Sequence, residues 1–205
     1  VAIGAGRNRN AGDWNYATQS RRQPGSTAKP IFDYGPGMEY NDFSTYTLFN
    51  DEPWTYTNGP EIGNWDGSYQ GLITLRQALS VSRNIPALKA FQQVDKKNIV
   101  TFVNNLGLDV AYSTKSENYK KDEKTGADNV INEAYSIGGM AYGVTPLDMA
   151  EAYASFANGG YHIETHAVTK IEYRSTGETV DFSEEKKKVM SDSTAYLMNN
   201  VLKYA

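Results

Sequence analysis

The segment Arg22–Pro30, Arg-Gln-Pro-Gly-Ser-Thr-Ala-Lys-Pro, constrains this chain more than any other. Pro24 and Gly25 form a turn signal, and Pro30 lacks an N–H, so it is best tolerated in the first turn of a helix. A helix is therefore expected to begin close to Ser26. Residues three positions apart share one helix face, which puts Lys29 beside Ser26.

This spacing suits nucleophilic chemistry. A serine hydroxyl needs an adjacent base, and a buried lysine whose amine has lost its charge can be that base. Ser26 is thus a candidate nucleophile and Lys29 its candidate general base. The spacing alone is weak evidence, because it recurs at Ser183-Glu-Glu-Lys186. That copy lies in a charged run, and we interpret it as a solvated turn.

A second cluster of polar residues is Ser82-Arg83-Asn84, between the predicted helices 75–81 and 86–94. A hydroxyl and an amide on a short connection between helices can project into a cleft. Ser82 could relay a proton between Lys29 and a leaving group, and Asn84 could hydrogen-bond a peptide substrate. Helix capping is the simpler alternative, because Ser and Asn are good caps.

Together these patterns resemble the transpeptidase domain of class A penicillin-binding proteins, whose motifs are Ser-x-x-Lys, Ser-x-Asn and Lys-Thr-Gly. The similarity extends along Gln23–Pro30, Gly71–Ala87 and Ile137–Gly160, in the family's order. It implies an α+β, serine β-lactamase/transpeptidase-like fold, an antiparallel sheet flanked by helices, over residues 1–205. It also implies a bifunctional protein, with a glycosyltransferase domain and a membrane anchor upstream of this chain.

The resemblance implies a D,D-transpeptidase that cross-links peptidoglycan stem peptides ending in D-Ala-D-Ala through a Ser26 acyl-enzyme. β-Lactams would act as covalent inhibitors at the same serine, and no cofactor is expected. The implied location is the extracytoplasmic face of the bacterial cell membrane. Thr27, next to the candidate nucleophile, and Trp65, in an aromatic loop, are further candidates for substrate binding. Helix-terminal bonding is an adequate explanation of Thr27, and packing of the loop is favoured over substrate binding for its aromatic residues.

The third family motif is not where it is expected. Lys124-Thr125-Gly126 lies in the polar run Ser113–Asp128, which has neither the β-forming residues nor the alternation of a buried strand, and we reject it. The family places this motif after Gly160, where the sequence contains no other copy. We therefore expect a C-terminal remainder of the same domain to complete the active site, and we expect the 205 residues alone to be incomplete as an enzyme.

Three alternatives to the transpeptidase stay open. A class A β-lactamase shares the Ser-x-x-Lys motif but needs an efficient deacylating carboxylate, and no segment here is identified as its loop. A D,D-carboxypeptidase would use the same serine with water as acceptor. A non-catalytic β-lactam sensor or assembly scaffold is the third, although the presence of all four motif residues favours chemistry.

Composition argues against several other classes of protein. A net charge of −4 and the absence of cysteine argue against a nucleic-acid partner and against thiolate metal sites. His162 and His166 stand in a predicted loop leading into a strand rather than on a helix, and no metal site is expected. No apolar run approaches the length of a membrane span.

The expected elements begin with a strand at Val1–Arg7, which would join a C-terminal hairpin in one sheet. A helix at Ser26–Tyr40 is expected to be irregular at Gly35-Pro36-Gly37, and Asn41–Gly71 is expected to be a long loop. Further helices are expected at 75–81, 86–94, 96–106 and 146–158, a hairpin at 167–173 and 179–182, and a last helix from Ser191.

Overall fold

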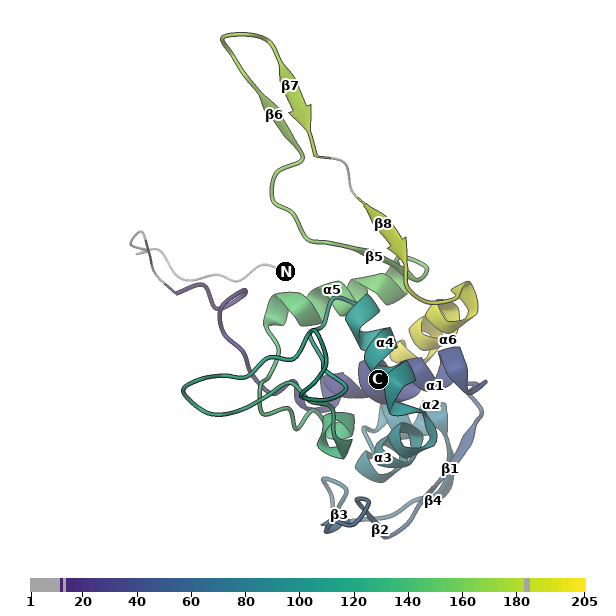
Figure 1. The fold of residues 1–205 in the computed structure, drawn as a ribbon. Coiled ribbons are helices and arrows are strands. Elements are labelled where there is room, and N and C mark those ends of the chain that lie inside the picture. Colours follow the sequence, from purple (N-terminus) through teal and green to yellow (C-terminus); the bar gives the residue numbers. More distant parts are fainter. Residues whose placement is uncertain (1–11, 13, 183–184) are drawn as a thin grey trace.

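The computed structural model describes residue 12 and residues 14–182 and 185–205. The helices form one body, and the strands form short antiparallel ribbons at its margins (Figure 1). The helices are α1 (Gly35–Tyr40), α2 (Leu75–Ser80), α3 (Asn84–Gln93), α4 (Lys96–Asn105), α5 (Pro146–Ala157) and α6 (Asp192–Leu202). The expected strand Val1–Arg7 lies outside the described residues, so its place in a sheet stays a prediction.

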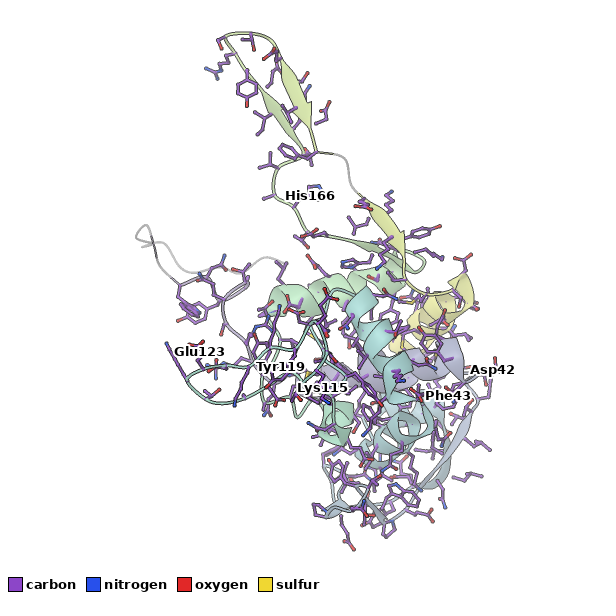
Figure 2. The ribbon with its side chains drawn as sticks, viewed as in Figure 1. Asp42, Phe43, Lys115, Tyr119, Glu123 and His166 are labelled. Carbon is purple, nitrogen blue, oxygen red and sulfur yellow. The ribbon has the colours of Figure 1, made fainter. Side chains whose placement is uncertain are left out.

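The ribbons pair β1 (Leu48–Asp51) with β4 (Gly71–Thr74), β2 (Trp54–Thr55) with β3 (Glu61–Ile62), β5 (Tyr161–Ile163) with β8 (Lys186–Lys188), and β6 (Lys170–Glu172) with β7 (Thr179–Asp181). The expected hairpin is therefore confirmed in β6 and β7. It projects away from the helices as an arm, and His166 lies near its base (Figures 1 and 2).

Local capping explains where the helices begin. Thr74 and Gln77 form a capping box at the start of α2, and Thr145 and Asp148 form another at α5. The Ser191 side chain accepts a hydrogen bond from Thr194 N at the start of α6. The sequence predicted these starts correctly, because caps are local signals.

The segment that carries Ser26 and Lys29 passes through the hydrophobic core. It contains a 3-10 turn, η1 (Gly25–Ala28), a π-helical turn, η2 (Pro30–Tyr34), and then α1. Ala28, Ile31 and Phe32 are fully buried in the main cluster of apolar side chains, together with residues of α3, α4, α5 and α6. The motif is thus carried by a segment that is packed into the hydrophobic core.

One expectation for this segment was wrong. The helical irregularity lies at Pro30–Tyr34 and not at Gly35-Pro36-Gly37, which is regular α-helix. Pro36 stands in the first turn, where its missing N–H costs little. Gly37 makes room for a neighbour, because a Cβ there would lie 2.1 Å from the ring of Phe43.

The expectation of one long loop over Asn41–Gly71 was wrong in part. The segment contains β1, β2 and β3, and β1 alternates between exposed and buried side chains. Its buried positions are Phe49 and Asp51, and the acidic residue hides the alternation that normally identifies a strand.

The polar run Ser113–Asp128 forms an exposed, loop-rich excursion, marked in Figure 2 by Lys115, Tyr119 and Glu123. Lys124-Thr125-Gly126 lies in a turn of it, where the Asp122 carboxylate accepts hydrogen bonds from Lys124 N at 2.9 Å and Thr125 N at 2.8 Å. This copy of Lys-Thr-Gly is therefore not on a strand, as the sequence indicated.

Candidate active site

Lys29 is the centre of the candidate site. Its side chain is fully buried, and its Nζ donates to Asn84 Oδ1 at 2.8 Å, Ser82 O at 2.8 Å and Ser82 Oγ at 3.0 Å. The structure therefore brings together three of the four motif residues that the sequence predicted, across more than fifty positions of the chain.

Ser26 stands beside this cluster at the surface. It lines a cavity of about 230 Å³ together with Thr27, Ser82, Tyr153 and Leu202. The Lys29 backbone N–H bonds to Ser26 O, which confirms that a helical turn begins at this serine. Among the described residues no hydrogen bond joins Ser26 Oγ to Lys29 Nζ, whose three bonds go to Ser82 and Asn84.

The environment of Lys29 lowers the pKa of its amine. Burial is the largest effect and lowers the pKa of the amine to about 8; the charge of Asp33 opposes this shift, and the charge of Arg83 adds to it. A lysine with a pKa near neutrality can exist as a free amine in a useful fraction of molecules. General-base catalysis requires that form.

Asp33 lies one turn beyond Lys29 on η2. It is fully buried, and neither carboxylate oxygen has a hydrogen-bond partner among the described residues. Burial raises its pKa well above the usual range, while the nearby Lys29 acts in the opposite direction. Spacing of four positions from Lys29 was visible in the sequence, but we did not identify Asp33 there.

The Ser-x-Asn connection has an unusual backbone. Ser82 has φ +55°, a left-handed conformation that is uncommon outside glycine, and its N–H bonds to Leu79 O at 3.0 Å. This turn directs both its carbonyl and its hydroxyl toward Lys29. The capping alternative is wrong: Asn84 is the first residue of α3, whose N-cap is Arg83 without a side-chain cap bond, and the Asn84 side chain contacts Lys29.

Thr27 and Trp65 have other partners. Thr27 Oγ1 donates to Pro24 O at 2.7 Å, in agreement with the helix-terminal alternative. Trp65 is 73% exposed, and its Nε1 donates to Val81 O at 3.2 Å, one residue before Ser82. Binding of substrate by either residue stays a prediction.

Sequence reasoning missed the polar groups under the Ser-x-Asn turn. Arg83 is 1% exposed and bonds to Asp51 at 2.8 Å and to Asp66 at 2.9 Å. Asn64 Oδ1 accepts from Asn84 N at 2.9 Å. These partners come from the Asn41–Gly71 segment, and no motif connects them with residues 82–84.

Two other features bear on the function classes. The groups of acidic and histidine side chains in the described ranges offer no cluster suited to a metal ion. Within the same ranges, no helix has the length and apolar character needed to cross a bilayer.

Comparison with known proteins agrees with this geometry. Residues 3–205 match the family described as the penicillin binding protein transpeptidase domain. The chain is 49% identical to penicillin-binding protein 1A/1B of Bacillus subtilis, covering 100% of this chain and 21% of the relative. It is 38% identical to penicillin-binding protein 1A of Streptococcus pneumoniae, covering 92% of this chain and 25% of the relative.

The fold agrees as well. Penicillin-binding protein A of M. tuberculosis, solved as an imipenem acyl-enzyme complex, superposes with a TM-score of 0.75 at 18% identity, covering 94% of this chain and 46% of the other. That likeness confirms the predicted α+β fold of the serine β-lactamase/transpeptidase type. The chain spans about a fifth to a quarter of the two curated relatives. It belongs to the penicillin-binding protein transpeptidase family, in the class A type that its sequence resembled.

Proposed function

We propose that this chain carries the acylation machinery of a D,D-transpeptidase that cross-links peptidoglycan stem peptides. One observation above all supports the proposal: a buried lysine of lowered pKa bonds to both residues of the Ser-x-Asn motif beside a surface serine. Perturbed titratable groups concentrate at functional sites, and the bonds of Lys29 to Ser82 and Asn84 place this one within the motif residues.

In the proposed reaction the Ser26 hydroxyl attacks the carbonyl carbon of the penultimate D-alanine. The Lys29 amine takes the hydroxyl proton as the C–O bond forms. The tetrahedral intermediate collapses with cleavage of the peptide C–N bond, and D-alanine leaves with a proton supplied from Lys29 through Ser82 Oγ, 3.0 Å away. An amine of a neighbouring stem then attacks the Ser26 ester, forms the cross-link and frees the serine.

The roles of Asn84 and the cavity follow from their positions. The Asn84 amide holds Lys29 through Oδ1 and is proposed to guide the peptide at the rim of the site. β-Lactams mimic the scissile amide, so Ser26 would open their ring and retain the acyl group. The membrane anchor, the glycosyltransferase domain and the extracytoplasmic location remain predictions for the full-length protein, supported by the class A relatives.

The proposal is tested by intact-mass analysis of the full-length protein after incubation with benzylpenicillin. We expect one stable adduct per molecule, and none in Ser26→Ala. Ser183→Ala, which changes the other Ser-x-x-Lys copy, serves as the matched control and should acylate normally. Absence of an adduct in the unmodified protein would contradict the proposal, and rapid drug hydrolysis would favour a β-lactamase.

A D,D-carboxypeptidase remains the second candidate, because it uses the same acyl-enzyme with water as acceptor. Product analysis on a stem peptide separates the two: cross-linked dimer supports the transpeptidase, and release of D-alanine alone supports the carboxypeptidase. A sensor or scaffold would yield neither product.

A further inference from the structure

A chain of buried hydrogen bonds runs from β1 to the candidate catalytic lysine. Asp51 Oδ1 accepts from Asn64 Nδ2 at 2.7 Å, and Asn64 Oδ1 accepts from Asn84 N at 2.9 Å. Asn84 Oδ1 in turn accepts from Lys29 Nζ at 2.8 Å. Asp51 is fully buried and Asn64 is 7% exposed, so water competes little for these bonds.

The same carboxylate holds the residue between the two motif positions. Asp51 Oδ2 accepts from Arg83 Nε at 2.8 Å and from Gln70 N at 3.0 Å. Every acceptor site of Asp51 that the structure describes is thus directed to the Ser-x-Asn turn or to the loop that covers it. The Asn84 side chain is fixed from its other end as well, because its Nδ2 donates to Gly63 O at 2.9 Å.

These hydrogen bonds hold the Ser-x-Asn turn in an unfavourable backbone conformation. Ser82 has φ +55°, and such a backbone persists only where its surroundings over-determine it. The anchors of the turn are the buried Arg83 guanidinium on one side and the Asn84 N–H on the other. Both lead to Asp51, the first directly and the second through Asn64.

We propose that Asp51 and Asn64 are positioning residues that set the geometry of Ser82 and Asn84 against Lys29. This inference rests on the proposed function and deepens it. It gives the Asn41–Gly71 segment a role in catalysis through its buried polar groups. The sequence had instead pointed to the aromatic side chains of this segment.

The orientation of the amide gives a sharp test. Asn64 must donate to Asp51 and accept from Asn84 N, so it has one productive orientation. In Asp51→Asn two donors face each other in every arrangement: the new amide N–H meets Arg83 or Asn64, or, if the Asn64 amide turns, its N–H meets Asn84 N. In Asn64→Asp two carboxylates face each other at the place of a 2.7 Å hydrogen bond.

The double exchange, Asp51→Asn with Asn64→Asp, restores the pattern. The new amide accepts from Arg83 and donates to the new carboxylate, which accepts from Asn84 N. Net charge is unchanged, but the ion pair of Arg83 with residue 51 becomes a hydrogen bond to a neutral oxygen, and the bond from Asn64 Nδ2 to Ser68 O at 2.9 Å is lost. The exchange should therefore acylate faster than either single variant.

Asp66→Asn is the matched control. Asp66 also pairs with Arg83, at 2.9 Å, and the substitution removes the same charge. Its bonds otherwise go to Ser68, and it has none to Asn64 or Asn84 among the described residues. It should leave acylation nearly unchanged.

The experiment measures benzylpenicillin acylation of the full-length protein against pH, with a melting curve for each variant. We expect acylation by Asp51→Asn to fall about 100-fold, the usual cost of a catalytic group displaced by about 1 Å. Loss of the Asn84 acceptor should also move the rising limb of the pH profile to lower pH, because that hydrogen bond favours the charged amine. A purely structural role would reduce the active fraction and leave the limb in place.

Equal rates for Asp51→Asn and Asp66→Asn, or a double exchange no better than the worse single variant, would overturn the inference. If Asp51→Asn does not fold, the comparison of Asn64→Asp with the double exchange decides. If even the unmodified protein fails to acylate, the proposed function fails by itself. An NMR titration of the Lys29 amine in the unmodified protein and in the variants then still tests whether Asp51 and Asn64 act on Lys29, since it needs no activity.

Discussion

At the scale of single residues, the state of the Lys29 proton controls the proposed chemistry. Spacing in the sequence predicted that Lys29 serves Ser26, and it predicted Ser82 and Asn84 as partners. In the structure Lys29 Nζ donates hydrogen bonds of 2.8–3.0 Å to Ser82 and Asn84. Asp51 and Asn64 could not be predicted, because their importance comes from burial and distant contact and has no signature in local spacing. Asp33 has such a signature, four positions from Lys29, but its burial is what makes it notable.

The pH dependence of acylation follows from the lowered pKa of Lys29. Only the neutral amine can accept a proton, so the acylation rate should rise with pH and level off above about 8. Below that value the rate should fall about tenfold per pH unit. Stopped-flow acylation between pH 6 and 9.5 checks this.

Lys29→Arg is the informative variant for that profile. A guanidinium keeps the charge and donates hydrogen bonds but does not deprotonate in this range. We expect acylation to fall by about 10²–10⁴-fold and the rising limb near pH 8 to disappear. A limb that persists in Lys29→Arg would assign the titration to another group.

At the scale of elements, the turn that carries the candidate nucleophile depends on a backbone contact. Gly138 ends the 3-10 turn η3 (Glu133–Ile137) with φ +80°, and a Cβ there would lie 2.2 Å from Gly25 O, 2.4 Å from Gly25 N and 2.6 Å from Gly25 Cα. Gly25 directly precedes Ser26. The sequence predicted the elements that have caps or apolar periodicity, but it did not predict η3, whose role is this close approach.

Gly138→Ala should therefore displace the nucleophile. Left-handed backbone in alanine costs about 1–2 kcal/mol, and the clash with Gly25 adds to it. We expect a lower melting temperature together with a loss of acylation of at least about tenfold.

Gly177→Ala is the control for backbone strain alone. It has φ +74° in the β6–β7 turn, and nothing lies within 4 Å of the added Cβ. It should show a similar strain cost and normal acylation. Equal loss of acylation in both variants would show that the contact of Gly138 with Gly25 is unimportant.

At the scale of the whole molecule, the candidate catalytic cluster and the projecting hairpin are separate parts. α5 and α6 flank the ribbons β5–β8 and β6–β7 in sequence and are held directly: Asn199 Nδ2 donates to Phe156 O at 2.6 Å. Ser191, at the start of α6, bonds through its backbone N–H to Glu39 Oε2 at 3.0 Å. Continuity of the chain through the hairpin is thus unnecessary for the position of either helix.

A cut in the hairpin should be tolerated. A site for a sequence-specific protease inserted between Thr176 and Gly177 should allow complete cleavage, with acylation within about threefold of the uncut protein. The same site between Asp66 and Gly67 should abolish acylation on cleavage, because the cut opens the loop in which Asn64 holds Asn84 N and Ser68 O holds Arg83. Loss of activity on cleaving the hairpin would mean that the arm supports the site.

The bonds of Lys29 also fix how many hydrogens the site can hold. An ammonium has three N–H groups and the structure gives them three acceptors, whereas a neutral amine has two and a lone pair. The Ser82 carbonyl and the Asn84 amide oxygen can only accept, but the Ser82 hydroxyl can reverse and donate. Deprotonation of Lys29 is therefore expected to turn a single hydroxyl and leave the other two bonds intact. A replacement at position 82 that cannot reverse, such as Ser82→Ala, would leave the amine able to change its charge but without this partner for its lone pair.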